Sequence, residues 1–383
     1  MKIAKFLYLI VFFTANINAQ VNKPGIVKIK DINIYQDSNF YSSFPSIIKR
    51  PNGEYLLAFR RAPERKMFGE KGSTHVDPNS YLVMMRSKDG INWPKQPDLL
   101  YAYPFGGSQD PCLLQLKDGS VICASYSWVF PRPDANLKVP NFGNSSAVFN
   151  GGYIVKSLDG GTTWQGPHYP PPIPGEIHND AFGKTLPAFN RGAMYEGKKG
   201  QIYWGVASID KEKPLINSTH LYISYDKGIT WKYTSTIAKS DTVSFSETSV
   251  YETPKGDVIA FMRTEFFDDQ ACIARSKDGG KIFTWEKMGF QGHPLAMVRL
   301  PDNRVLLTYG YRHQPFGIRA RILNAECTDY KTSKEFIVRN DGGTRDLGYS
   351  WPVVLSHNKV LIVYYFNKEN GTRHIAGSIL EIR

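Results

Sequence analysis

Cysteine is scarce in this chain, and long apolar runs and blocks of one charge are missing. The four cysteines among the 383 residues are Cys112, Cys123, Cys272 and Cys327. Four are too few for the disulfide framework of a small secreted domain. Cys112 and Cys123 flank one turn, but a tip at Asp118 and Gly119 would set Cys123 opposite Leu114. The sequence therefore leaves a bridge between these two cysteines open.

The charge pattern excludes one class of partner. The chain has 47 Lys and Arg against 35 Asp and Glu, a formal net charge of +12, with the basic residues scattered. Scattered basic residues argue against a nucleic-acid groove. They favour an acidic sugar or an acidic glycan as the partner of an exported protein. No sustained helical periodicity and no glycine-rich phosphate loop before a helix are present.

The first 19 residues resemble a secretory signal. Lys2 and Lys5 precede the apolar run FLYLIVFF, which is too short to span a bilayer, and NINA ends on the small residue Ala19. We therefore expect cleavage after Ala19 and a soluble protein in the periplasm or outside the cell. No later stretch reaches membrane-spanning length. Residues 20–383 are then left for one domain, which we expect to be a monomer.

One motif occurs six times: a turn built on Gly or Asn, followed by an apolar run of strand length. The turn residues are Gly53, Gly119, Gly200, Gly256, Asn303 and Asn358. Gly and Asn suit tight hairpins because these need positive φ. Apolar runs without alternation, such as EYLLAF and DVIAFM, indicate strands that are covered on both faces. The repeat predicts an all-β fold, a six-bladed β-propeller.

A second repeat carries an Asp and a Trp. It reads SKDGINW from Ser87, SLDGGTTW from Ser157, SYDKGITW from Ser224 and SKDGGKIFTW from Ser276. An Asp side chain can accept backbone N–H bonds inside such a turn, and the Trp can pack between neighbouring sheets. We therefore interpret Asp89, Asp159, Asp226 and Asp278 as parts of turns and not as ligands.

Two strands remain at the ends of the chain. IVKIKDINIY begins at Ile26, before the first repeat, and HIAGSILEI begins at His374, after the last. Pairing the two in one blade would close the ring and remove exposed sheet edges.

Asp-bearing turns on a secreted six-bladed propeller resemble the sialidase (neuraminidase) superfamily, and the resemblance covers essentially all of residues 20–383. The turns mark only the fold, so function depends on the mouth of the ring. The segments that enter the inner strands read SSFPS, SQDPC, FNRGA, FSETS, QGHPL and GYSWP. The ends of the following strands carry Arg60, Arg61, Tyr126, Arg263, Arg312 and Tyr365.

The resemblance assigns roles to several of these residues. GYSWPVV is similar to the nucleophile segment of the family, which implies Tyr349 as nucleophile. FSETSVYETPKGDVIAFMRTE is similar to the segment that supplies the partner carboxylate and an arginine for the substrate carboxylate, which implies Glu247 and Arg263. YGYRHQPFGIRARI resembles the segment with a further arginine of this clamp, for which we choose Arg319 ahead of Arg312.

The first blade supplies the remaining candidates. Asp77 in THVDPNSYLVMMRS stands where the family has its acid, and His75 is a rival acid or base. LLAFRRAPER resembles a basic stretch that touches substrate, which implies Arg60 or Arg61. One feature departs from the family: Ser43 occupies the place of its first clamp arginine.

Three further histidines are weaker candidates. His178 lies in the longest stretch between turns and is a candidate for substrate binding, whereas His313 and His374 more often would only satisfy hydrogen bonds. No spacing of His, Cys and Asp indicates a metal site, and no cofactor is expected.

These residues support three hypotheses about function. The first is an exo-acting glycoside hydrolase of sialidase type, with an acidic oligosaccharide or polysaccharide as substrate. The alternative is a uronate lyase or dehydratase. A sugar carboxylate acidifies the neighbouring C–H, so a Tyr or His base could remove that proton while a 4-linked sugar or water leaves. The third is a glycan-binding propeller without catalysis. The sequence leaves the sugar, its linkage and its sulfation open.

Overall fold

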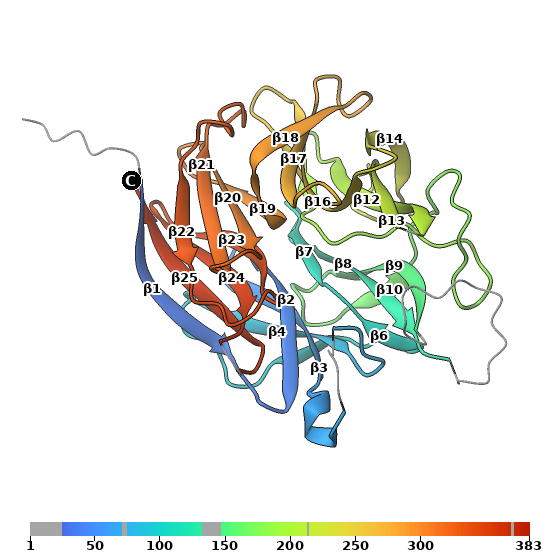
Figure 1. Cartoon of the computed structure of the whole chain (residues 1–383), viewed down its shortest axis with the longest axis horizontal. Helices are drawn as coiled ribbons and strands as arrows, with labels where there is room; N and C mark the ends of the chain where they lie inside the picture. Colours follow the sequence, from blue (N-terminus) through green and yellow to red (C-terminus); the bar gives the residue numbers. More distant parts are fainter. Residues whose placement is uncertain (1–24, 71–74, 132–146, 213, 369–370) are drawn as a thin grey trace, which may run out of the picture.

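The computed structural model describes residues 25–70, 75–131, 147–212, 214–368 and 371–383, so the expected signal at residues 1–19 lies outside the described part. Within it, 25 strands form six antiparallel sheets, and the one helical segment is the 3-10 turn η1 (Arg65–Phe68). Figure 1 shows the sheets arranged as a ring, which confirms the six-bladed β-propeller. In the described residues, no helix has the length and hydrophobicity to cross a membrane.

The first three blades follow one another along the chain. Blade one contains β2 (Phe40–Lys49), β3 (Tyr55–Pro63), β4 (Tyr81–Ser87) and β5 (Asp98–Tyr101). Blade two contains β6 (Gly106–Ser108), β7 (Cys112–Gln115), β8 (Val121–Val129), β9 (Val148–Ser157) and β10 (Gln165–His168). Blade three contains β11 (Tyr195–Glu196), β12 (Ile202–Glu212), β13 (Leu215–Ser224) and β14 (Lys232–Ala238).

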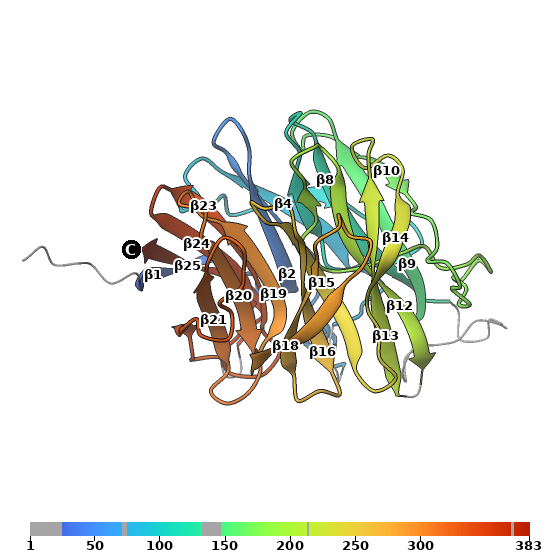
Figure 2. The same cartoon turned by 90° about the horizontal axis from the view of Figure 1, so that it is seen from above.

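The last three blades complete the ring, and the sixth joins both ends of the described chain. Blade four contains β15 (Ser244–Glu252), β16 (Val258–Glu265), β17 (Gln270–Ser276) and β18 (Thr284–Gln291). Blade five contains β19 (His293–Arg299), β20 (Val305–Tyr311), β21 (Gly317–Leu323) and β22 (Glu335–Arg339). Blade six contains β23 (Gly348–Ser356), β24 (Lys359–Phe366), β25 (His374–Ile382) and β1 (Ile26–Tyr35). Since β1 pairs with β25, with Ile26 opposite Ile382, the ring closes as expected (Figure 2).

Five of the six repeated turns connect the first and second strands of a blade, and the turn at Gly119 connects β7 and β8, the second and third strands of blade two. Five of their residues have positive φ, which the sequence led us to expect: Gly53, Gly119, Gly200, Gly256 and Asn303, with φ between 70° and 95°. Asn358 does not, and it lies in a shorter turn of two residues between Ser356 and Lys359. The strands that follow these turns, such as β3, β16 and β24, are almost entirely buried, because a neighbouring sheet covers each of their faces.

The Asp-bearing turns have the structural role that their sequence indicates. Asp89 Oδ1 accepts the backbone N–H groups of Ile91 and Asn92, both at 2.8 Å, and Ser87 binds the same carboxylate. Backbone hydrogen bonds lower the pKa of Asp89 far below its usual value. The other three turns repeat this pattern around Asp159, Asp226 and Asp278.

The cysteines form no disulfide: all four are free and buried. Our expected register around Cys123 is wrong by one residue, since Cys123 faces Leu113 and Cys112 faces Ala124. The cause is the turn, in which the N–H of Leu116 bonds to the carbonyl of Ser120 and leaves three residues in the loop instead of two.

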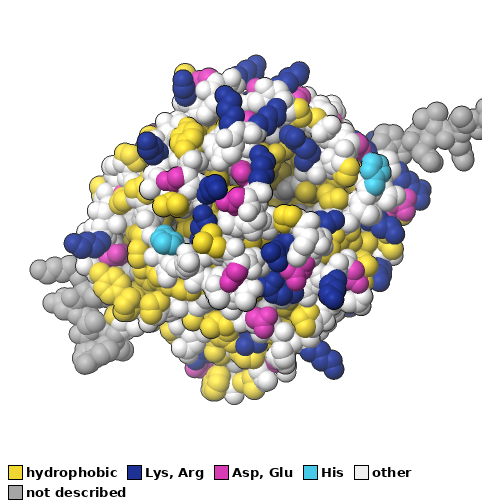
Figure 3. Space-filling model, turned by 180° about the vertical axis from the view of Figure 1, so that it is seen from behind, with side chains coloured by type: hydrophobic (Ala, Val, Ile, Leu, Met, Phe, Trp, Pro, Cys, Tyr) yellow, Lys and Arg dark blue, Asp and Glu magenta, His cyan; other side chains and the backbone are white. Residues whose placement is uncertain are grey.

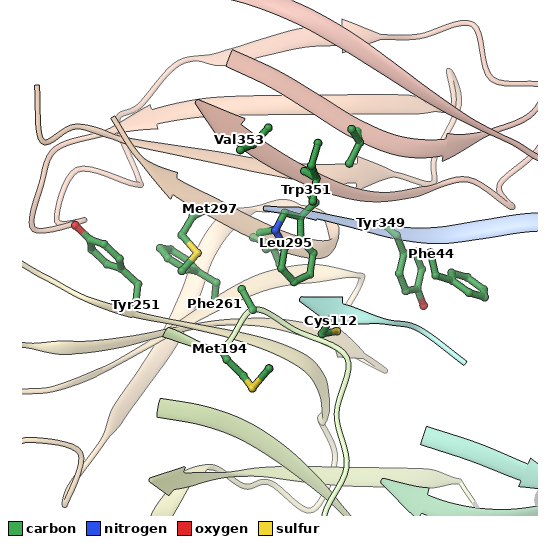
Figure 4. Packing of buried hydrophobic residues seen from close by; sticks show 14 of the residues in the cluster. Phe44, Cys112, Met194, Tyr251, Phe261, Leu295, Met297, Tyr349, Trp351 and Val353 are labelled. Carbon is green, nitrogen blue, oxygen red and sulfur yellow. The ribbon is translucent and has the colours of Figure 1, made fainter. Parts of the chain in front are cut away.

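The largest core lies where the inner strands meet. Figure 4 shows Leu295, Trp351 and Val353 together there, with Tyr349 and Phe44 side by side at one end. On the face in Figure 3, Lys and Arg are spread among acidic side chains.

Candidate active site

The innermost strands of three blades carry one extra residue each. Pairing skips from Ser43 to Ser46, from Ser246 to Ser249 and from Gly348 to Trp351, while the neighbouring strand advances by two residues. Within these bulges Phe44, Glu247 and Tyr349 have positive φ, at 57°, 43° and 51°. This backbone region is costly for residues with a side chain, and such strain is concentrated at functional sites. The bulges bring these three side chains together.

Tyr349 and Glu247 are joined directly. The Tyr349 hydroxyl donates a hydrogen bond to Glu247 Oε1. Arg263 Nη1 lies 2.6 Å from Glu247 Oε2 and 3.4 Å from the Tyr349 hydroxyl. Its other terminal nitrogen, Nη2, binds Glu265 at 2.6 Å. The structure therefore brings Tyr349, Glu247 and Arg263 into one hydrogen-bonded group.

The pKa values of Tyr349 and Glu247 are shifted in opposite directions. Burial raises the pKa of Tyr349 well above its ordinary value, and the charge of Glu247 raises it further. Burial would also raise the pKa of Glu247, but the charge and hydrogen bonds of Arg263 outweigh it and lower this pKa to about 2. At neutral pH a neutral phenol therefore faces a carboxylate, the arrangement of a nucleophile beside its base.

Two cations lie over the ring of Tyr349. The guanidinium carbon of Arg312 is 5.3 Å from the ring centroid, and Arg312 also donates to Tyr365 Oη at 3.1 Å. The guanidinium carbon of Arg191 is 4.6 Å from the same centroid, and its Nη2 donates to the carbonyl of Pro45 at 3.1 Å. Arg191 was missed as a site residue, although it lies in the entering segment FNRGA.

Arg60 and Arg61 point to opposite faces of β3. Arg60 pairs with Ser43 across the sheet, is fully buried, and lies with its guanidinium carbon 5.9 Å from the ring of Phe44. Burial lowers the pKa of Arg60, against the effect of nearby groups that include Asp110. Arg61 instead stacks on Phe40, 4.1 Å from its ring centroid, away from this group. Of the two, Arg60 is the residue beside the cluster.

Asp77 and His75 are in different situations. Arg65 binds both oxygens of Asp77, at 2.6 and 3.0 Å, and the side chain of Asp77 is buried. The ring of His75 packs edge-on against Phe44, at 5.0 Å between centroids. Burial lowers the pKa of His75 to about 4, although the charge of Asp346 opposes this shift. His75 is therefore neutral at neutral pH.

Arg319 is not brought to Tyr349. It lies on β21, the third strand of blade five, with its guanidinium carbon 4.5 Å from the ring of Tyr311. It donates to the carbonyls of Arg339 and Pro315 and lies 3.5 Å from Glu335. Since all these partners belong to blade five or its connecting loops, Arg319 braces that blade, and Arg312 stands at the mouth in its place.

The three weaker histidine candidates each have another partner, and of the three His313 borders a small hollow together with Arg312. His178 Nδ1 is 2.6 Å from Glu176 Oε1 within the connection between β10 and β11. His313 Nε2 is 3.0 Å from Asp269 Oδ2. His374 Nδ1 is 3.1 Å from the carbonyl of Thr372.

Asp110 is a second residue that sequence reasoning missed, although it lies in the entering segment SQDPC. It is buried, and its Oδ2 accepts a hydrogen bond from Tyr126 at 3.0 Å. Its Oδ1 has no hydrogen-bond partner among the described residues. Burial raises the pKa of Asp110 to about 6, an effect that the charge of Glu247 increases and that of Arg191 opposes. With this pKa the Asp110 carboxyl can both donate and accept a proton at a pH close to neutral.

A third carboxylate, Asp346, organises the side of the cluster in blade six. It accepts hydrogen bonds from Tyr41 and Tyr365 and lies 3.0 Å from Arg373 Nε. Burial opposes ionisation of Asp346, but the positive charge that His75 takes up in acid and the charge of Arg373 lower the pKa of Asp346.

A cavity of about 220 Å³ opens beside Glu247. Trp128, Phe149 and Phe189 form an apolar wall, and Arg191 also borders the space. Mixed apolar walls with a few charged groups are typical of small-molecule sites. Among the described residues, no three His, Cys, Asp or Glu side chains are arranged to hold a metal ion.

Sequence comparison identifies one family. Residues 138–362 match the family model of the BNR repeat-like domain. No curated protein matches the chain. The crystal structure of a protein of unknown function from Dyadobacter fermentans DSM 18053 is 64% identical, with a TM-score of 0.92, and the match covers 94% of this chain and 100% of that one.

Solved sialidases share the fold at low identity. The NanB sialidase from Streptococcus pneumoniae is 13% identical with a TM-score of 0.63, over 93% of this chain and 70% of that one. A Trypanosoma rangeli sialidase, in a complex with 2,3-difluorosialic acid described as a covalent intermediate, is 14% identical with a TM-score of 0.64. That match covers 94% of this chain and 59% of the sialidase. At these identities the comparison shows a sialidase-like propeller.

Proposed function

The chain belongs to the BNR repeat-like domain family, and on that premise we propose that it is a glycoside hydrolase that removes an acidic sugar from the end of a glycan. The single observation that carries the proposal is the hydrogen bond from Tyr349 to Glu247 beside Arg263. A tyrosine nucleophile is an accepted departure from the usual pair of carboxylates in glycosidases. A neutral phenol also suits an acidic sugar, because it does not repel the carboxylate of the substrate.

The proposed reaction has two steps. Tyr349 Oη attacks the anomeric carbon while its proton passes to Glu247, and the bond to the leaving oxygen breaks as that oxygen takes a proton from an acid. Water then attacks the same carbon and gives its proton to the conjugate base of that acid. The bond to Tyr349 breaks, and the phenolate recovers its proton from Glu247. The sugar leaves with its original anomeric configuration.

The arginines support an acidic substrate. Arg312 lies 5.3 Å from the ring centroid of Tyr349, Arg263 lies 3.4 Å from its hydroxyl, and Arg60 adds a buried cation from blade one. A guanidinium can bind a carboxylate through two parallel hydrogen bonds. Arg60 is therefore our candidate for the function of the arginine that Ser43 replaces.

Two carboxyl groups compete for the role of the acid. Both oxygens of Asp77, the residue implied by the family resemblance, are bound to Arg65. Burial raises the pKa of Asp110 to about 6, and one of its oxygens has no hydrogen-bond partner among the described residues. Two carboxyl groups whose pKa values are pushed apart, here Glu247 and Asp110, are the usual sign of a base and an acid. We assign the acid role to Asp110.

The test uses two sets of oligosaccharides, one ending in sialic acid and one in uronic acid. Wild-type protein and Tyr349→Phe are compared for release of free sugar and for the ultraviolet absorbance of a new C=C bond. Sugar release by the wild type alone supports the hydrolase. No release from either set, with glycan still bound, would leave a binding propeller and refute the proposal.

Elimination is the second candidate reaction, and the environment of His75 is the observation that favours it. This histidine is neutral at neutral pH and feels the charges of Arg60, Arg312 and Glu247. A neutral imidazole beside cations that bind a uronate carboxylate could remove the acidified proton at C5. In the same assay, absorbance without hydrolysis, lost in His75→Gln, would identify this reaction.

A further inference from the structure

A second and larger cavity lies beside blade two, against the connection between β10 and β11 and outside the group around Tyr349. Its volume is about 540 Å³, and aromatic and proline side chains form most of its wall. Phe105, Tyr169 and Phe182 are 56%, 51% and 54% exposed there. Three large apolar side chains left in solvent around one hollow are characteristic of a binding surface.

Hydrogen bonds and a ring contact constrain the surface. Phe182 stands at the tip of a hairpin closed by the bridge between Asn179 and Thr185, and Asp180 Oδ1 accepts the backbone N–H groups of Phe182 and Lys184 at 2.8 and 2.9 Å. The ring of Phe105 packs against that of Phe182 at 5.2 Å. The aromatic faces are thus fixed before any ligand arrives, which lowers the entropic cost of binding.

The opposite wall is equally constrained. Tyr169 precedes three consecutive prolines, whose φ angles are fixed, and the carbonyl of Pro172 accepts a hydrogen bond from Tyr222 at 2.9 Å. Tyr103 connects the two walls, because its hydroxyl lies 3.3 Å from that of Tyr169 and 2.7 Å from Asn150 Nδ2. An aromatic wall with hydroxyl and amide groups suits a ligand with both apolar faces and hydroxyls.

Charge narrows the class of ligand. Lys184 borders the cavity from the same hairpin with an exposed side chain, and it forms no ion pair with any residue that the structure describes. Asp180 also borders the cavity, but its carboxylate accepts two backbone N–H groups of the hairpin. The cavity beside Glu247 is close by along the chain, since Phe149 lines that cavity and Asn150 lines this one. Likewise, Phe189 lines the cavity beside Glu247 and Pro187 lines this one. The two cavities are therefore built from the same two segments of the chain, one at Phe149 and Asn150 and one at Pro187 to Phe189.

We propose that this cavity is a second glycan subsite, in which Phe105 and Phe182 stack on a sugar of an acidic polysaccharide and Lys184 binds its carboxylate. The acidic nature of the ligand rests on the proposed function. The hydrolytic step does not enter the proposal, so binding and hydrolysis can fail separately.

Native gel electrophoresis with an embedded polysaccharide tests the proposal. The probes are polygalacturonate, alginate and polysialic acid, with neutral dextran as control polymer. We expect at least one acidic polymer, and not dextran, to retard the wild type. Phe182→Ala should weaken that binding about tenfold, as loss of a central aromatic contact does at other interfaces. Lys184→Ala should weaken it most at low salt. Tyr225→Ala is the matched control, because this tyrosine is 72% exposed in the turn between β13 and β14.

The outcomes separate the alternatives. Retardation by none of the three acidic polymers, or equal retardation of Phe182→Ala and wild type, overturns the subsite. A change of oligomeric state in Phe182→Ala overturns it in favour of contact between two copies of the chain. Unchanged turnover of a monosaccharide aryl glycoside by Phe182→Ala, with weaker binding of the polymer, supports the subsite. If the wild type is retarded but hydrolyses nothing, the proposed function fails while the subsite stands.

Discussion

The hydroxyl of Tyr349 in blade six donates a hydrogen bond to the carboxylate of Glu247 in blade four, 102 residues away in the chain. Each of the two residues occupies the left-handed position of a bulge in the innermost strand of its blade. The contact therefore depends on closure of the whole ring and on a local strain in two strands. Such backbone strain is costly and is concentrated at functional sites, which is a reason to assign the pair to chemistry.

Replacing Glu247 by Gln tests the role of its charge. The amide keeps the shape of the side chain but cannot accept the proton of Tyr349, so we expect kcat to fall about 10²- to 10⁴-fold. The matched control is Glu265→Gln, because Glu265 also binds Arg263 at 2.6 Å but lies 39% exposed at the rim. Steady-state rates and thermal unfolding of both variants are compared. Equal losses of rate in the two variants would show that only the environment of Arg263 matters.

Asp110 and Asp77 can be distinguished by the leaving group. If Asp110 is the acid, Asp110→Asn should be strongly impaired on an oligosaccharide and much less on a sugar with an activated phenol, which departs without a proton. Asp77→Asn frees Arg65 from a paired, buried carboxylate and should instead lower the unfolding temperature, with the same effect on both substrates. Rates on the two substrates decide the assignment. A selective effect in Asp77→Asn would return the acid role to that residue.

The pKa of Asp110 sets the expected dependence on pH. Since the protonated form is the acid and its pKa is raised to about 6, activity should fall as the pH rises through about 6. Glu247, with a pKa of about 2, stays ionised over this whole range, so it causes no further change of activity with pH. The raised pKa of Asp110 also predicts a loss of folding stability as the pH rises from about 4 to about 6, because the unfolded chain releases this proton earlier. Asp110→Asn should remove both effects, which rate profiles and thermal unfolding can check.

The repeats predict the fold well because each local signal has one structural solution. The turns at Gly53 and Gly256, the strands after them and the Asp-bearing hairpins are properties of a few neighbouring residues, and the structure has them all. The error at Cys123 shows the limit. One more residue in a turn moves the register of the hairpin, and the sequence does not fix that length.

The candidate site was only partly predictable, since it is made of contacts between blades. Tyr349, Glu247 and Arg263 carry a recognisable pattern, and the structure brings them together. Arg191 and Asp110 come from blades three and two, and only closure of the ring sets their charges close to Glu247. Their segments were visible as entering segments, but nothing local distinguishes a buried charge at the mouth from one in an ordinary turn.

Arg312 and Arg319 offer a final comparison within one blade. Arg312 lies over the ring of Tyr349, so Arg312→Ala should raise KM for an acidic sugar, by a loss of about 2–5 kcal/mol if the substrate carboxylate is buried against it. Arg319→Met keeps apolar volume but leaves the carbonyls of Arg339 and Pro315 without their donor. It should lower the unfolding temperature and leave KM unchanged. Steady-state kinetics with thermal unfolding separates the two. A rise in KM for Arg319→Met at intact folding would restore the choice that the sequence favours.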